Sequence, residues 1–180
     1  LTTGAHNTFV GAEAGDDMVE GSYNIAIGSD ALGGSKDSTA DSSQFNIFMG
    51  VNSGNGAWVT AVSQYNVGIG HYTLDGAMNG AVNNTAVGHG ALSAITTGDS
   101  NATLGYHAGY ALTTGHSNVI IGENAGSTAT TEIANSVMVG NDAGQTAVSA
   151  RHVFIGDHAG YSAVASDGQV FIGFYAGGQV

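Results

Sequence analysis

The chain repeats one pattern of hydrophobic and polar positions along its whole length. Each unit has an Asn or another polar residue, three mostly apolar residues, a Gly, two variable residues, a small residue, and then Gly or Leu, as in NVIIGENAG at 118–126. The intervals between successive central glycines are 17, 22, 20, 18, 17, 17, 18, 16 and 17 residues. A near-constant interval with a positional code predicts stacked repeats. We therefore predict an all-β fold, a parallel β-solenoid of about ten coils of 16–22 residues.

The apolar run of each unit predicts one short strand. With the central Gly as position 0, position −1 is aliphatic in all ten units and position −3 is mostly β-branched. Such alternation, ended by Gly, is typical of a strand whose positions −1 and −3 face the interior. Position −2 ranges from Gly68 to Phe48 and is too apolar for an open solvent face. We expect another chain to cover position −2 and the small residues at +3 and +4.

Two positions of the repeat are expected to be structural. The Gly at position 0 permits a corner that a Cβ would block. The Asn at position −4 is expected to bond corner backbone groups and to stack with the coils above and below, the alternative being a row of exposed ligand-binding amides. The glycines are Gly11, Gly28, Gly50, Gly70, Gly88, Gly105, Gly122, Gly140, Gly156 and Gly173, and the asparagines are Asn7, Asn24, Asn46, Asn66, Asn84, Asn101 and Asn118.

Composition narrows the possible partners. The net charge is −12, and Lys36 and Arg151 are the only cations besides histidine, which argues against nucleic acid and anionic membrane surfaces. No apolar run is long enough to insert into a membrane, and no cysteine is present for a disulfide or a thiolate site. Because the repeat covers residues 1–180 and begins part-way through a unit, we expect a single repeat-array domain, excerpted from a longer fibrous protein.

The strings NIAIGSDAL (24–32), NTAVGHGAL (84–92) and NSVMVGNDAG (135–144) resemble the head repeats of trimeric autotransporter adhesins, the YadA-like head. They are similar also to the repeat arrays of bacteriophage tail-fibre-domain proteins. The resemblance spans the whole chain, although the unit is about three residues longer than the adhesin repeat. It implies a left-handed parallel β-roll, an intertwined homotrimer, and a role in surface attachment.

Polar residues offer few candidates for chemistry. The histidines form no motif of a preformed metal site, so no metal and no cofactor are expected, although a trimer would bring three copies of His71, His89 or His152 to a common axis. Asp142 and Asp157 occupy positions +2 and +1 of successive coils and are expected to be near neighbours, as a carboxylate pair of a polysaccharide-cleaving tailspike would be. Surface charge is the simpler interpretation of these carboxylates. No catalytic residue is predicted.

Two long coils provide the candidate ligand-binding residues. Insertions in solenoids form loops, commonly on the binding face. The segment 33–43 carries Lys36 and Asp37, and the segment 54–65 carries Asn55 and Trp58, the only tryptophan. The loops belong to consecutive coils and should lie side by side, where an aromatic ring next to polar groups suits a sugar. The alternative is that Trp58 folds back and covers the shaft.

Together these features predict a non-enzymatic attachment segment of an extracellular fibre, either a virion tail fibre or a bacterial surface adhesin. A coil with two or three inward aliphatic residues cannot fill a thick core, which favours a homotrimer. The expected partner is a cell-surface glycan or an outer-surface protein. A tailspike-type polysaccharide-degrading enzyme and an ice- or mineral-binding solenoid are the alternatives.

Overall fold

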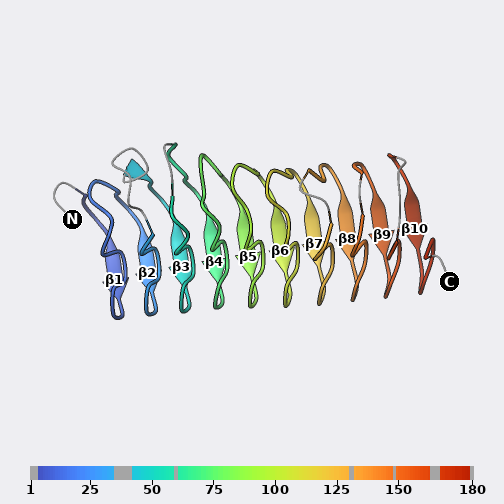
Figure 1. The fold of residues 1–180 in the computed structure, drawn as a ribbon, viewed down its shortest axis with the longest axis horizontal. Helices are drawn as coiled ribbons and strands as arrows, with labels where there is room; N and C mark the ends of the chain where they lie inside the picture. Colours follow the sequence, from blue (N-terminus) through green and yellow to red (C-terminus); the bar gives the residue numbers. More distant parts are fainter. Residues whose placement is uncertain are drawn as a thin grey trace.

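A computed structural model describes residues 4–34, 42–58, 61–129, 132–147, 149–162 and 167–178, and within these residues the fold is an all-β parallel solenoid without α-helices. Ten strands of three residues each form one parallel sheet in chain order, and the first and last strands lie at opposite ends of the stack (Figure 1). The strands are β1 (Thr8–Val10), β2 (Ile25–Ile27), β3 (Ile47–Met49), β4 (Val67–Ile69), β5 (Thr85–Val87), β6 (Ala102–Leu104), β7 (Val119–Ile121), β8 (Val137–Val139), β9 (Val153–Ile155) and β10 (Val170–Ile172). The predicted fold class and the predicted strands are confirmed.

The register is the same in every pair of strands, whatever the length of the coil between them. Ile25 pairs with Ile47 across the longest interval, and Val137 pairs with Val153 across the shortest. Position −3 therefore always lies beside position −3, and extra residues are accommodated outside the sheet. The constant register explains why the repeat pattern survives insertions.

The central glycines form the corner after each strand. They have φ between 125° and 143°, a region that L-residues rarely adopt, and a Cβ on Gly122 would collide with the carbonyl oxygen of Gly140 in the next coil. The predicted reason for Gly at position 0 is thus confirmed. Positions −5, +2 and +4 also adopt positive φ in every coil, even where the residue is Tyr23, Asp30 or Leu32.

The inward side of each strand is position −2, opposite to the prediction. Ile120 is 1% exposed, whereas its neighbour Ile121 is 37% exposed, and Phe48, Met138 and Phe154 are likewise buried at position −2. The prediction failed because both faces of the strands are apolar, so alternation alone did not identify the interior. The small residues at +3 and the leucines at +4 pack on the same inward side as position −2 and complete the core.

The core has a further row of apolar residues that the repeat pattern did not reveal. Met18, Ile95 and Leu112 lie seven residues after their central Gly and are buried, and Met78 and Trp58 are buried one position later. Side-chain sizes compensate between coils. A Cβ on Gly68 would lie 2.8 Å from the Phe48 ring, so the missing side chain in β4 makes room for the large one in β3.

The asparagines at position −4 form a buried ladder through the middle of the stack. Asn101 Nδ2 donates to Asn84 Oδ1 (3.0 Å) and to Gly115 O (2.8 Å). Asn101 Oδ1 in turn accepts the backbone N–H (3.2 Å) and the Nδ2 (2.9 Å) of Asn118. Each amide from Asn24 to Asn101 thus uses both donors and both lone pairs, which is the full capacity of the group. This is the structural role that the sequence predicted for these residues.

Candidate functional site

The outward face of the sheet is a continuous apolar strip, hereafter the sheet strip. It consists of the side chains at positions −1 and −3 of all ten strands, none of which is charged. All of them are exposed or half-buried, and Leu104 is 51% exposed. A contiguous exposed apolar surface of this kind marks an interaction site rather than a free protein surface. The sequence identified these residues but assigned them to the interior of a single chain.

A shallow hollow of about 230 Å³ lies in the middle of the sheet strip. It is lined by Thr85, Val87, Ala102, Thr103, Leu104 and Ile121. Ala102 stands where β7 has Val119 and β8 has Val137, so the shorter side chain opens the hollow. Because the lining is almost entirely apolar, the hollow suits an aliphatic side chain from another molecule.

Trp58 does not lie on the surface, and its predicted role in sugar stacking is wrong for this conformation. The indole is 1% exposed and packs edge-on against the Phe48 ring, with 5.7 Å between ring centroids. Phe48 faces Gly68 and Gly54, and the room beside these glycines lets two large rings share one coil. The indole Nε1 is buried and has no hydrogen-bond partner among the described residues. The alternative prediction, that Trp58 covers the shaft, is confirmed.

The other ligand-binding candidates divide between described and undescribed segments. Lys36 and Asp37 lie outside the described residues. Asn55 is half-buried, and its Oδ1 lies against Gly33 of the preceding coil. Trp58 N donates to Gly34 O at 3.0 Å. The described parts of the two insertions therefore lie side by side, as predicted.

Two exposed aromatic surfaces were not anticipated from the sequence. At position −5, the rings of His6, Tyr23, Phe45 and Tyr65 stack in a column with centroid distances of 4.8, 5.0 and 5.1 Å. The faces of the inner rings cover one another, so the column presents mainly ring edges to solvent. The sequence signal for this column is an aromatic residue two positions before the strand in four consecutive coils.

The second aromatic surface, hereafter the corner cluster, contains Tyr72, His89, Tyr106, His107 and Tyr110 from three successive coils. Tyr106 stacks on His107 at 3.9 Å, and His107 lies 4.5 Å from Tyr110. Burial lowers the pKa of His107, and the neighbouring His89 lowers it further, so His107 is held in its neutral form. The corner cluster offers planar aromatic surfaces, and its members Tyr106 and Tyr110 are exposed to solvent.

Asp142 and Asp157, at positions +2 and +1 of successive coils, lie close to each other, as predicted. His158 bridges them, with Nδ1 2.7 Å from Asp157 Oδ1 and Nε2 3.5 Å from Asp142 Oδ2. With the Asn141 amide nitrogen turned toward the carboxylates, it donates to Asp157 Oδ1 at 3.1 Å and to Asp142 Oδ2 at 2.9 Å. Imidazole and amide groups thus occupy the space between the carboxylates. The arrangement ties two coils together.

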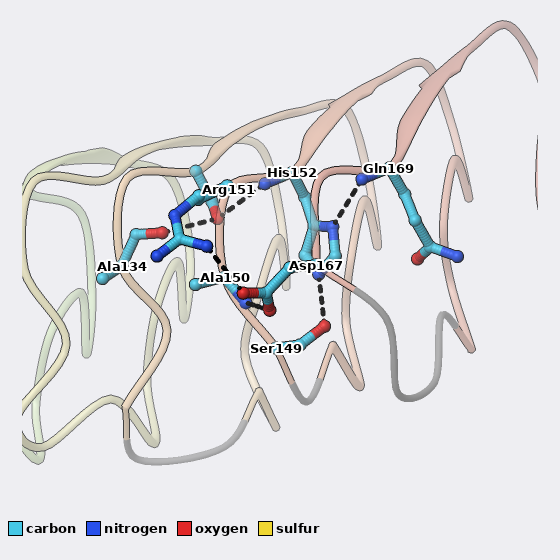
Figure 2. A network of polar contacts seen from close by, with 8 residues as sticks. Ala134, Ser149, Ala150, Arg151, His152, Asp167 and Gln169 are labelled. Atoms are coloured by element: carbon cyan, nitrogen blue, oxygen red, sulfur yellow. Dashed lines mark hydrogen bonds and ion pairs between the residues drawn. The ribbon is translucent and has the colours of Figure 1, made fainter.

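His152 is buried in the ladder and does not point to an axis between chains. Its Nδ1 accepts the N–H of Gln169 (3.3 Å), and its Nε2 bonds the Ser149 hydroxyl (2.8 Å), so both ring nitrogens are used (Figure 2). Burial lowers the pKa of His152, and nearby Asp167 opposes this effect. Asp167 also pairs with Arg151 at 2.9 Å. The suggestion of an axial ion at His152 is therefore wrong.

His71 and His89 do not complete a metal site in the single chain. His71 Nδ1 accepts the backbone N–H of Val51 at 3.0 Å, and His89 belongs to the corner cluster. In the part of the chain that the structure describes, no three His, Cys, Asp or Glu side chains converge on a possible ion position. The described segments also include no helix of the length and apolarity needed to cross a membrane.

No protein-family model matches the chain, and comparisons with curated proteins and with solved structures give no significant match. The surfaces of this chain itself are therefore the guide to its function. Among these surfaces, the sheet strip is the one that extends over all ten coils.

Proposed function

We propose that the chain is a non-enzymatic structural segment of an extracellular attachment fibre, in which three parallel copies pack their sheet strips together around a common axis. The observation that carries the proposal is the sheet strip itself, twenty uncharged side chains on the outer face of one parallel sheet. Parallel sheets are normally covered on both faces. In the single chain the core covers one face, and a neighbouring copy would cover the other.

Several features support copies of the same chain as the cover. The sheet strip runs the length of the stack, so a partner must present an apolar surface of equal length. Another copy presents such a surface in the same repeat, and closed rotational symmetry leaves no strip unpaired. The hollow beside Ala102 would then receive aliphatic side chains from neighbouring copies at the same level. Three narrow strips around one axis would form a second, dry core.

Contact with a cell surface would fall to side chains outside the sheet strip. The corner cluster, with Tyr106 48% and Tyr110 44% exposed, is a better candidate for this contact than Trp58, because Trp58 is buried. Rings with exposed faces favour sugar rings or planar groups as ligands. A virion tail fibre and a bacterial surface adhesin would both use such a segment.

The test is the mass per unit length of the particles, measured by scanning transmission electron microscopy or by the cross-section term of small-angle X-ray scattering. Wild-type particles are expected to show three chains per cross-section. Leu104→Asp places a charge in the sheet strip, and three such charges near the axis are expected to reduce this value to one chain. Tyr110→Asp changes a similarly exposed residue of the same coil outside the strip and serves as the matched control. A wild-type cross-section of one chain would overturn the proposal.

A further inference from the structure

The sheet strip repeats so regularly that most of it does not fix how far one copy is shifted along another. Fifteen of its twenty positions hold Val or Ile, and the strands stack in one row along the long axis (Figure 1). A shift by one coil, about 4.8 Å, would again set Val and Ile against Val and Ile. Strands that repeat in this way specify their register weakly, so a local irregularity is needed to select one alignment.

The irregularities of the sheet strip gather at β5 and β6. Five of its positions depart from Val and Ile, and three of these line the hollow, namely Thr85, Ala102 and Leu104, whereas Thr8 and Met49 lie elsewhere. We infer that the hollow is a register site, which receives Leu104 of a neighbouring copy and aligns the copies coil by coil. This rests on the lateral packing proposed above and adds the alignment, which that packing leaves open.

Leu104 is the side chain that fits the hollow of a neighbouring copy. It is 51% exposed, whereas the other exposed Val, Ile and Met side chains of the strip in β2–β9 are 37–40% exposed. The hollow has about 230 Å³, and a cavity of about 150 Å³ accepts benzene, which has more carbon atoms than a leucine side chain. Leu104 and the hollow lie at one level of the stack. Rotational symmetry therefore lets each copy fill the hollow of the next, and the arrangement closes after three copies.

A shift by one coil would remove this fit. In either direction, such a shift sets Leu104 of one copy against β7 of the other. There Val119 occupies the place of Ala102 and fills the space that the alanine leaves open. Leu104 would then be crowded at β7, and the hollow would stay unfilled. Overpacking and cavities both destabilise a packed contact, so the aligned arrangement is favoured.

The Thr85 hydroxyl favours the same alignment for a different reason. It lines the hollow and has no hydrogen-bond partner among the described residues, while the Thr85 carbonyl accepts the Thr103 hydroxyl at 3.3 Å. An apolar neighbour would take away its water without replacing the hydrogen bond, which is costly. Aligned copies bring three Thr85 hydroxyls to one level, where each can donate to the next and accept from the previous one. After a shift by one coil, the hydroxyl would face Val67 or Ala102, and neither side chain can form a hydrogen bond.

Disulfide trapping measures the alignment, because the chain has no cysteine of its own. Two versions of the full chain are co-expressed, one with Val139→Cys and one with Ile155→Cys, at paired positions of successive strands. The Cα atoms of a disulfide lie within about 7 Å, so 139–139 and 155–155 bonds report aligned copies, and 139–155 bonds report a shift by one coil. Val137→Cys and Val153→Cys form a second pair at position −3. Mass spectrometry of the linked peptides distinguishes the bonds.

In the wild-type strip, aligned bonds are expected to predominate. Thr85→Val combined with Ala102→Val removes the hydroxyl and fills the hollow but keeps the strip apolar, so mass per unit length should stay at three chains. Shifted bonds are expected to rise at least about tenfold, because three hydroxyls no longer select the alignment. Thr85→Val alone keeps the shape of the side chain, so an increase in this variant cannot come from misfolding. Val67→Ile is the matched control, because it enlarges a strip residue away from the hollow and should leave shifted bonds rare.

The outcomes separate this inference from the lateral packing on which it rests. Three-chain particles with as many shifted as aligned bonds in the wild type would overturn the register site and leave the lateral packing in place. The same holds if the double variant leaves the fraction of shifted bonds unchanged. A wild-type cross-section of one chain, or no bond from either cysteine pair, would overturn the lateral packing itself and the register site with it.

Discussion

Ile120 and Ile121 are adjacent in β7 but lie on opposite faces of the sheet. Ile120 packs in the core, so Ile120→Ala is expected to lower the free energy of unfolding by about 2–5 kcal/mol at every protein concentration. Ile121→Ala removes a partly exposed side chain of the sheet strip, and its effect should grow with protein concentration as lateral association sets in. Chemical denaturation at several concentrations measures both. Equal losses for the two variants in dilute solution would show that the assignment of the faces is wrong.

Asn101 tests the amide ladder at a single position. Asn101→Asp replaces the group that donates to Asn84 Oδ1 and Gly115 O with a buried carboxylate that cannot donate. A loss of about 3–5 kcal/mol is expected at neutral pH, because the charge and its neighbours are left without partners.

The control for the ladder is Asn101→Ser, since Ser136 already serves in the ladder and its Oγ accepts the N–H of His152 at 3.0 Å. We expect a smaller loss, about 1–2 kcal/mol, for this variant. Thermal melts of both variants against wild type provide the comparison. A serine variant as unstable as the aspartate variant would indicate that volume, not hydrogen bonding, governs this position.

At the scale of the coils, two groups give the stability opposite dependences on pH. Burial raises the pKa of Asp75 to about 6, so the folded state binds its proton more tightly than the unfolded state. Stability from this group is therefore present below about pH 4 and is lost as pH rises toward 6. The pKa of His152 is lowered, so the folded state binds this proton less tightly, and stability is lost as pH falls below about 6.5.

Asp75→Asn and His152→Asn separate the two contributions. Asp75→Asn is expected to stabilise the protein by about 1–2 kcal/mol at pH 7, after allowance for solvent around the half-buried carboxylate, and to leave stability unchanged near pH 3. His152→Asn is expected to remove the destabilisation between pH 6.5 and the lower folded-state pKa. Denaturant midpoints from pH 3 to 8 measure both effects. An Asp75→Asn variant whose pH profile matches wild type would contradict the burial argument.

The sequence predicted the elements well because the repeat encodes the backbone. Each strand falls on the predicted positions, and each corner needs the glycine that the pattern places there. The sequence did not predict which face of each strand lies in the core. Position −2 varies between Gly68 and Phe48 because side chains of different coils compensate inside the core, whereas most outward positions hold Val or Ile. Positions that hold Val or Ile in most coils are typical of an outer surface that repeats from coil to coil. Positions whose side chains vary in size are typical of a packed interior.

At the scale of the whole molecule, the candidate surfaces depended on information that a single repeat does not contain. Trp58 is buried because Gly68, in another coil, leaves space beside Phe48. The corner cluster combines rings from positions +1, +2 and +5 of three coils, so a single repeat position does not reveal it. Asp142 and Asp157 could be paired from the sequence because both follow a central Gly closely in successive coils. Neighbours at equal or adjacent positions of successive coils can thus be predicted from the repeat, whereas the compensation of side-chain sizes between coils cannot.

The direction of the backbone hydrogen bonds has a mechanical consequence. Bonds such as that from Thr8 N to Asn24 O join successive coils, so they run parallel to the long axis (Figure 1). Tension applied to the ends of one chain loads these bonds one coil at a time, and a single chain should peel open in steps. With 17 residues between Gly105 and Gly122, each step would lengthen the chain by roughly 50–55 Å, given about 3.4 Å per extended residue and about 4.8 Å between stacked strands. Such a segment would extend under a pulling force by unfolding one coil at a time, before all coils of the chain are unfolded.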